Sequence, residues 1–318
     1  MLIEKLKLDI KGKGIKIIFP ETHDIRVREA AKRLAKEGLI TPIMIGDFND
    51  YPDAKGLVFI SPKTYGALDA LKAKVLERRK GKLTPEQADQ LLQEPTFFGT
   101  ALIYDGKAHG LIAGATQSTG DTIRPALQLI KTKPNIEKSF GYFIMLRDRD
   151  IYLMGDCAIN PDPSAEELAS FGIEMAAIAK NYNIEPKVAM LSFSTKGSAD
   201  TPSTQKMAEA TRIAKELAPE LLIDGEMQFD AAVDPGVGQK KFPGSKVAGE
   251  ANVFVFPDLN AGNIGYKIAQ RWGGFEAVGP FLAGLNAPVN DLSRGCSEED
   301  VYKTAIVTAS QAIIYDKN

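Results

Sequence analysis

Histidine and cysteine are scarce in this chain of 318 residues, which has two of each. The histidines, His23 and His109, are too few for a metal site with three histidine ligands, and a Ser-His-Asp triad would have to use one of them. The cysteines, Cys157 and Cys296, lie far apart and form no C-x-x-C pair. They indicate free thiols in a reducing compartment, so neither a disulfide framework nor a metal site is expected.

Long apolar runs and an excess of charge are missing as well. No apolar run approaches the roughly 18 residues of a membrane-spanning helix, and residues 1–16 alternate lysine with aliphatic residues, unlike a signal peptide. We therefore expect a cytoplasmic protein without a membrane partner. The formal net charge of −2 gives no reason to expect nucleic acid as a partner either.

Two nucleotide-binding fingerprints are also absent. No G-x-G-x-x-G opens a strand–helix unit, which argues against a nicotinamide-dependent oxidoreductase, and no G-x-x-x-x-G-K-[ST] P-loop occurs. What the chain does contain is an alternation of short β-branched runs with helical periodicity, which indicates α/β architecture with parallel strands. Its length suggests roughly two domains. Strands are predicted at residues 15–19, 41–45, 57–60, 109–115, 151–154, 188–193, 221–223 and 252–256.

Helix starts and a domain boundary are marked by local signals. Capping boxes at 84–87 and 164–167 predict two helices, the first with Pro85 in its first turn. Further helices are predicted over 24–36, 65–79 and 202–217 and from residue 297 to the end. The charged run 147–150 lies between two apolar runs, so a domain boundary is expected near 145–150.

Polar, glycine-containing loops follow several predicted strands, at 116–121, 156–160, 194–198 and 257–263. Ligands of open α/β sheets bind outside the carboxyl ends of the strands, so these loops are candidate ligand sites. The backbone N–H groups of 116–121, just before a helix carrying Arg124, suit a phosphate. The basic run 78–82 is either a favourable placement of cations at a helix C-terminus or an anion-binding patch.

The stretch 290–300 is the strongest candidate for catalytic chemistry, because it brings a hydroxyl, a guanidinium and a carboxylate to the start of the last helix. Asp300 has two interpretations. Ser297 and Asp300 have the spacing of a capping box, and a carboxylate in a first helical turn has a lowered pKa, which makes it a poor base. It is therefore either a helix cap or the general base of the reaction.

Four blocks of sequence resemble the phosphate acetyltransferases of the phosphate acetyl/butyryltransferase family. They are Asp-Cys-Ala-Ile-Asn-Pro-Asp-Pro at 156–163, Ser-Phe-Ser-Thr-Lys-Gly-Ser at 192–198, Phe-Pro-Asp-Leu-Asn-Ala-Gly-Asn-Ile-Gly at 256–265, and the run 288–296. The resemblance covers nearly the whole chain. It implies two three-layer α/β/α domains with a cleft between them, similar to the isocitrate/isopropylmalate dehydrogenase fold, and usually a homodimer. The last helix would return to the first domain, giving 1–146 plus 288–318 for the first domain and 147–287 for the second.

The resemblance implies reversible acetyl transfer between coenzyme A and phosphate, with no permanently bound cofactor and with CoA, acetyl-CoA, phosphate and acetyl phosphate as small-molecule partners. Direct attack by the CoA thiolate would need no covalent acyl-enzyme. A phosphate butyryltransferase, or another short-chain phosphate acyltransferase, is the alternative. A noncatalytic module that binds CoA esters belongs to a different class, and the intact catalytic residues argue against it.

Roles are carried over residue by residue. In the family pattern, Ser293 matches the serine that hydrogen-bonds the CoA sulfur, Arg294 the arginine that holds the phosphoryl group, and Asp300 the proposed base. The other expected substrate ligands are Arg79 (or the adjacent Arg78), Arg124, Cys157, Ser194, Thr195, Lys196, Asp258 and Asn260. Gln117 stands where many relatives have histidine, which weakens any mechanism that needs a histidine there. Cys157 is expected to be a buried hydrophobe more often than a nucleophile.

Overall fold

The computed structural model describes residues 2–134 and 136–315, which divide into two compact α/β units. The first unit takes in the chain up to residue 133 and from residue 285 onward, and the second unit takes in residues 134–284. The α/β fold class predicted from the sequence is confirmed. Each unit is described separately below.

The sheet of the first unit has five strands, all parallel to their neighbours, in the order β11-β4-β1-β2-β3. Helices cover both faces, so β1 reads as a continuous apolar run with Ile17, Ile18 and Phe19 fully buried. The strands are β1 (Lys16–Phe19), β2 (Thr41–Ile45), β3 (Val58–Ile60), β4 (Gly110–Ala113) and β11 (Val289–Asp291).

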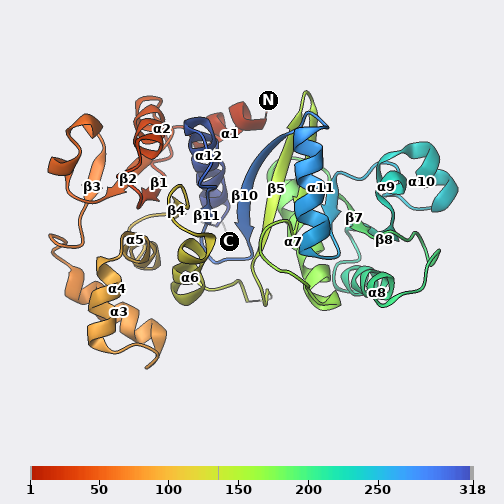
Figure 1. Cartoon of the computed structure of the whole chain (residues 1–318), viewed down its shortest axis with the longest axis horizontal. Coiled ribbons are helices and arrows are strands. Elements are labelled where there is room, and N and C mark those ends of the chain that lie inside the picture. Colours follow the sequence, from red (N-terminus) through yellow and green to blue (C-terminus); the bar gives the residue numbers. More distant parts are fainter. Residues whose placement is uncertain (1, 135, 316–318) are drawn as a thin grey trace. The chain divides into compact units, whose positions relative to one another are not determined.

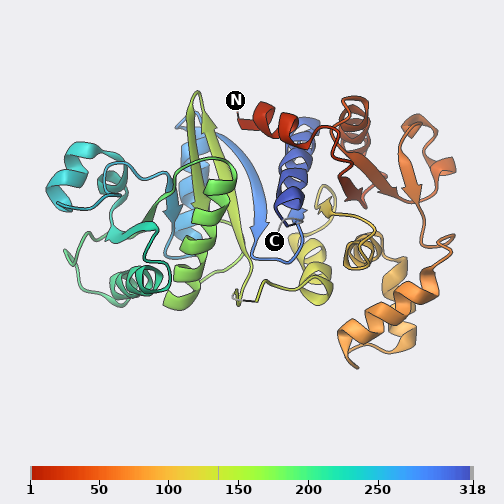
Figure 2. The same cartoon turned by 180° about the vertical axis from the view of Figure 1, so that it is seen from behind.

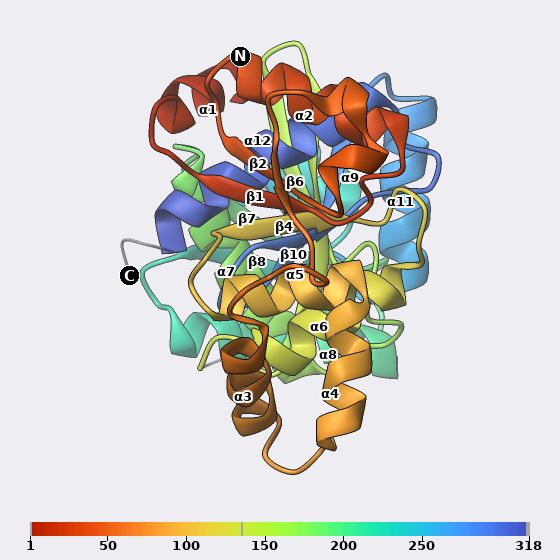
Figure 3. The ribbon, with the colours of Figure 1, turned by 90° about the vertical axis from the view of Figure 1, so that its left-hand side faces the viewer.

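Two groups of helices sandwich this sheet (Figures 1 and 3). One face carries the two ends of the chain, α1 (Leu2–Ile10), α2 (Ile25–Lys36) and α12 (Glu298–Tyr315). The other face carries α3 (Leu68–Arg79), α4 (Pro85–Gln93), α5 (Pro95–Tyr104) and α6 (Thr119–Leu129). The unit is therefore a three-layer α/β/α sandwich whose edge strand and one covering helix come from the C-terminal part of the sequence.

The sheet of the second unit is mixed, with the order β10-β5-β6-β9-β7-β8. β5 pairs antiparallel with β6 and with β10, and the remaining neighbours are parallel. The strands are β5 (Phe140–Arg147), β6 (Asp150–Gly155), β7 (Lys187–Leu191), β8 (Leu222–Met227), β9 (Val253–Val255) and β10 (Glu276–Ala283). The helices are α7 (Ala165–Asn181), α8 (Pro202–Leu217), α9 (Phe229–Val233), α10 (Pro235–Lys241) and α11 (Leu259–Arg271).

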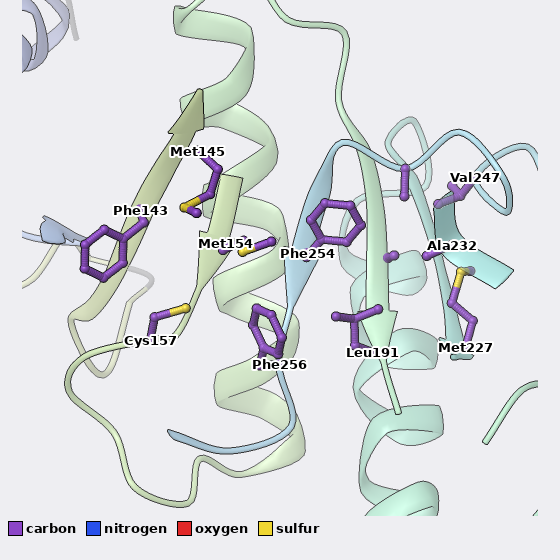
Figure 4. Packing of buried hydrophobic residues seen from close by; sticks show 12 residues of the cluster. Phe143, Met145, Met154, Cys157, Leu191, Met227, Ala232, Val247, Phe254 and Phe256 are labelled. Atoms are coloured by element: carbon purple, nitrogen blue, oxygen red, sulfur yellow. The ribbon is translucent and has the colours of Figure 1, made fainter. Parts of the chain in front are cut away.

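Helices cover this sheet on both faces too. α7 and α8 lie over the face that is nearer in the view from behind, and α11 lies over the opposite face (Figures 1 and 2). The core beneath α11 is a cluster of aromatic, methionine and aliphatic side chains that includes Phe143, Met154 and Phe254 (Figure 4). The ring of Phe143 stacks on Tyr266 of α11 with 4.0 Å between centroids. This packing holds the middle of α11 against β5.

Two predictions about the chain's organisation have clear outcomes. Both predicted capping boxes are confirmed, with Thr84 and Ser164 each accepting from the residue three positions on. The boundary expected near 145–150 is wrong, because the charged run is the hairpin turn between β5 and β6, in which Arg147 lies opposite Asp150. The break between the units lies at 133/134 instead, and on the return at 284/285.

Candidate active site

The turn between β11 and α12 presents Ser293 and Arg294 to solvent. The Ser293 hydroxyl accepts a hydrogen bond from Gly295 N at 3.2 Å, and Cys296 N donates to the Ser293 carbonyl at 2.9 Å. Within residues 2–134 and 136–315, no acidic side chain pairs with the Arg294 guanidinium. The turn therefore offers a hydroxyl and an available guanidinium side by side. These are the groups that a phosphoryl ligand and a polarised carbonyl require.

Arg26, in the first turn of α2, fixes the backbone of this turn. Its Nη1 donates to the carbonyls of Arg294 (3.0 Å) and Cys296 (2.6 Å), and its Nη2 donates to the Ala115 carbonyl at 3.0 Å. A charge-assisted pair with Asp24 orients the guanidinium and lowers the pKa of the Asp24 carboxyl. Sequence reasoning missed Arg26, since the carbonyls that it binds lie 89 to 270 residues away and leave no local signal.

The loop after β4 is closed by Glu21, which follows β1. The buried Glu21 carboxylate accepts hydrogen bonds from the N–H groups of Ala115 (2.8 Å), Thr116 (2.7 Å) and Gln117 (3.0 Å), and from the Thr116 hydroxyl (2.7 Å). Glu21 thus already occupies the first N–H groups of the loop, and phosphate binding by the N–H groups of 118–121 stays a prediction. The loop is an anion nest that the chain fills itself.

Asp291, the last residue of β11, is a second buried carboxylate beside the same loop. Its Oδ2 accepts from the Thr119 hydroxyl at 2.6 Å, whereas Oδ1 is buried with no hydrogen-bond partner among the described residues. The pKa of Asp291 is raised to about 6, mainly by burial and in smaller part by the Glu21 charge, while the hydroxyls of Thr119 and Thr122 oppose the shift. The sequence pattern of 290–300 points to Ser293, Arg294 and Asp300, and gives no local signal for Asp291.

Asp300 forms the reciprocal capping box that its spacing predicts. Its Oδ2 accepts from both the backbone N–H and the hydroxyl of Ser297, each at 2.8 Å, and Asp300 N donates to the Ser297 hydroxyl at 3.2 Å. The carboxylate thus satisfies one of the free N–H groups at the start of α12. The cap is present in the structure, and a role as base has to operate alongside it.

The two adjacent arginines at the end of α3 are not equivalent. The Arg78 guanidinium donates to the carbonyls of Leu129 (2.7 Å) and Ile130 (3.0 Å), which close the C-terminal end of α6. Nε of Arg79 is buried without a hydrogen-bond partner among the described residues. Repulsion from Arg78 and its basic neighbours lowers the pKa of Lys131. The positive charge of this cluster favours an anion. Arg78 is bonded to backbone carbonyls, so Arg79 is the better candidate to bind that anion.

A pocket of about 500 Å³ lies in the first unit. It is bounded by the turn after β1, by α4 and α5, and by the start of α6. Glu21, Gln117 and Arg124 are among its lining residues. The Arg124 side chain is 69% exposed and lies 3.9 Å from Asp121, so it remains available to an anion. The pocket combines apolar lining residues, Leu91 and Phe97, with the exposed Arg124 cation.

Three of the predicted substrate ligands in the second unit are buried. Cys157 is fully buried in the core beneath α11 (Figure 4), and burial, followed by the nearby Asp156, raises the pKa of its thiol well above the usual value. The buried Ser194 hydroxyl donates to Glu226 at 2.8 Å. The Thr195 hydroxyl accepts from Gln228 N at 2.9 Å. Each of these side chains is enclosed or already bonded within the second unit, and substrate binding by them stays a prediction.

The other predicted ligands of this unit stay accessible. Lys196 is exposed at the apex of its loop, with positive φ and its ammonium 5.1 Å from the Phe242 ring centroid. Asn260 is exposed, and Asp258 is the N-cap of α11, accepting from Ala261 N at 2.9 Å. A Cβ on Gly262 would collide with the Asp156 carbonyl. Glycine at this position is therefore what lets the start of α11 approach the loop after β6 so closely.

Residues 2–134 and 136–315 contain neither a membrane-spanning helix nor a cluster of metal ligands. No helix in them is both long enough and apolar enough to span a membrane. No three histidine, cysteine or acidic side chains in them converge to hold a metal ion.

Comparison with known proteins gives consistent results. The family model described as phosphate acetyl/butaryl transferase matches residues 1–309. The phosphate acetyltransferase of Bacillus subtilis (strain 168) is 53% identical over 320 residues, covering 98% of this chain and 99% of that protein. The phosphate acetyltransferase of Staphylococcus aureus (strain Mu50) is 51% identical over 324 residues, with 98% and 99% covered.

Solved structures agree with this. A phosphotransacetylase from Streptococcus pyogenes superposes with a TM-score of 0.96 at 51% identity, with 98% of each chain covered. A 4-hydroxythreonine-4-phosphate dehydrogenase from Klebsiella pneumoniae, at 11% identity and a TM-score of 0.53 over 94% of this chain and 99% of that one, shares only the fold, as the predicted dehydrogenase-like architecture requires. The chain therefore belongs to the phosphate acetyl/butaryl transferase family of acyltransferases.

Proposed function

We propose that this chain is a phosphate acetyltransferase, which moves an acetyl group reversibly between coenzyme A and inorganic phosphate. The observation that carries the proposal is the exposed turn in which Ser293 lies beside an Arg294 guanidinium without an acidic partner in the described chain. High identity to phosphate acetyltransferases over the full length supports the same activity.

The chemistry assigned to this turn is a single acyl transfer. In the direction that forms acetyl-CoA, the CoA thiolate attacks the carbonyl carbon of acetyl phosphate, and phosphate leaves with the electrons of the C–O bond. Arg294 binds the phosphoryl oxygens and neutralises the charge that grows on them. The Ser293 hydroxyl donates to the sulfur or to the carbonyl oxygen. The enclosed Cys157 thiol, with its raised pKa, is unsuited to be a nucleophile, which supports transfer without an acyl-enzyme.

Deprotonation of the CoA thiol can be assisted in two ways. A free thiol has a pKa of about 8.5, so its deprotonation must be assisted. In one version Asp300 accepts the proton, and in the other Arg294 and the N-terminus of α12 stabilise the thiolate while Asp300 only caps the helix.

The variant Asp300→Asn separates these two versions. A fall in kcat of about 10²-fold or more, with rescue at high pH, identifies Asp300 as the base. A lower melting temperature with near-normal turnover leaves only the cap.

The substrate ligands divide between the two units. In the first unit, Arg79 and Arg124 are proposed to bind the phosphates of CoA, because the basic cluster and the pocket supply charge and space. In the second unit, Lys196, Asp258 and Asn260 remain proposed substrate ligands. No permanently bound cofactor is proposed, and we expect a homodimer, which sedimentation equilibrium would test.

The function is tested by phosphate-dependent release of CoA from acetyl-CoA and butyryl-CoA, measured side by side. Faster release from acetyl-CoA is expected, whereas a clear preference for butyryl-CoA would make the chain a phosphate butyryltransferase. No release from either ester would overturn the proposal. Arg294→Ala should lower kcat at least 10²-fold, as loss of a transition-state charge contact does. Arg212→Ala, on the exposed face of α8, is the matched control and should leave kcat unchanged.

A further inference from the structure

Asp291 lies on β11, two residues before Ser293, and its side chain is hydrogen-bonded to α6. Its Oδ2 accepts from the hydroxyl of Thr119, the first residue of α6, across 172 positions of sequence. Arg124, the proposed CoA ligand, is on that same helix. The carboxylate therefore connects the strand that leads into the Ser293–Arg294 turn with the helix that carries Arg124.

The backbone around Asp291 is shaped for this contact. Asp291 pairs with Ala113 in the β11–β4 register, and Leu292 N donates to the Ala113 carbonyl at 2.6 Å. The next residue of the loop, Gly114, has φ +106, and a Cβ there would overlap Asp291 Oδ1 and lie 2.7 Å from the Leu292 carbonyl oxygen. Glycine at 114 leaves room for the carboxylate between the two chain segments.

A stability role explains this arrangement poorly. The carboxylate is 2% exposed, one of its oxygens has no hydrogen-bond partner among the described residues, and no arginine or lysine pairs with it in the described chain. Burying a carboxylate with so few hydrogen-bond partners is costly, and groups whose pKa is shifted toward neutral pH cluster at functional sites. The charged residues on the neighbouring elements are Glu21 after β1, Asp121 and Arg124 on α6, and Glu298, Glu299, Asp300 and Lys303 on α12. Of these, the Glu21 carboxylate raises the pKa of Asp291 by charge repulsion.

We infer that Asp291 is a positioning residue, which holds the Ser293–Arg294 turn in a fixed relation to α6 through its hydrogen bond with Thr119. This inference rests on the proposed acetyl transfer for its kinetic consequence. Misplacing a catalytic turn affects the transition state more than the ground state, because the reacting groups must meet in a narrow geometry.

The inference is tested with Thr119→Val, which removes the donor and keeps the branched shape, and with Thr119→Ser, which restores the hydroxyl. The Val variant should lower kcat about tenfold, the effect of losing one charge-assisted hydrogen bond, with the KM for acetyl-CoA changed less than about threefold. The Ser variant should recover kcat to within about twofold of wild type. Unchanged kcat in the Val variant would overturn the inference, as would a Ser variant no better than Val.

A matched control and a second readout separate this inference from the proposed function. Thr308→Val removes a hydroxyl that accepts from Asn290 Nδ2 (2.8 Å) on the other side of the same strand, so it should lower the melting temperature and leave kcat and KM unchanged. Amide exchange of residues 293–297 should accelerate in Thr119→Val and not in Thr308→Val, and equal exchange would overturn the inference whatever the activity. An inactive wild type would instead refute acetyl transfer and leave the exchange result to decide.

Discussion

The loops at the strand ends of the two units are closed by buried carboxylates in different ways. In the second unit, Asp156 accepts from Ala158 N, Ile159 N and Asn160 N, which are two to four residues further on. In the first unit, Glu21 reaches a loop 94 to 96 residues away. Asp291 reaches across 172 residues. The second unit also closes the loop 194–198 with Glu226, which lies 29 to 32 residues away. Its loops are therefore held by nearby segments, whereas the first unit clamps together segments 94 to 172 residues apart.

The loops of the two units therefore differ in how many polar groups they leave exposed. In the second unit, polar side chains of the loops form hydrogen bonds within the unit, as the hydroxyls of Ser194 and Thr195 do. In the first unit the clamps come from neighbouring strands, so the turn they position keeps Ser293 and Arg294 exposed. Changes to the clamps of the first unit should therefore alter catalysis, and equivalent changes in the second unit should alter only stability.

The largest effect is expected for Gly114→Ala. The new Cβ would overlap Asp291 Oδ1 at a φ of +106, so overpacking and backbone strain add to roughly 3–5 kcal/mol of lost unfolding free energy, with little activity left. Gly197→Ala in the second unit is the control, since its Cβ would meet nothing within 4 Å at a φ of +77, and it should cost about 1–2 kcal/mol. Urea denaturation measures both, and equal losses would contradict the tight fit at 114.

Asp291→Asn should change how stability depends on pH. The pKa of Asp291 is raised from 3.8 to about 6, so its burial costs nothing below pH 4 and up to about 3 kcal/mol above pH 6. Asparagine does not titrate, so the unfolding free energy of the variant minus that of wild type should rise by about 3 kcal/mol between pH 4 and pH 7. Guanidinium denaturation across this range is the measurement. A difference that stays flat would mean that the carboxyl titrates normally.

Glu21→Gln and Asp156→Asn compare the two kinds of clamp directly. Each change removes a charged acceptor from several N–H donors and should cost about 2 kcal/mol. Only Glu21→Gln should also lower kcat, by about tenfold, because its loop leads to α6 and contacts Arg26 through Ala115. Initial rates at saturating acetyl-CoA give the answer, and an equal loss of activity in both variants would break the contrast between the units.

The smallest effect is expected for Cys157→Ala. It removes one buried sulfur from the core beneath α11, so about 1 kcal/mol of stability is lost and kcat stays within about twofold. The raised thiol pKa also predicts slow alkylation of native wild type by iodoacetamide at pH 8. Full loss of activity, or fast alkylation of Cys157, would instead indicate a mechanism with an acyl-enzyme on this cysteine.

Local signals in the sequence predicted the local features and little beyond them. The capping boxes at Thr84, Ser164 and Ser297 follow from residues three positions apart, and all three are present. α5 went unpredicted because eight of its ten residues are buried, which removes the helical periodicity. β10, with its Gly279-Pro280 pair, resembled a loop. At the site, Ser293 and Arg294 were found by resemblance, but Glu21, Arg26 and Asp291 act across distances that no short motif records.

The discontinuity of the first unit also constrains the order of events during synthesis. The edge strand β11 and the covering helix α12 come from the C-terminal end of the described chain. Until they emerge from the ribosome, β4 is an unpaired edge and the sheet face shared by α1 and α2 is partly bare. The second unit is one continuous segment and can fold before that point. Ribosome-bound chains that stop near residue 285 should therefore protect the second unit from protease while the first is still cleaved.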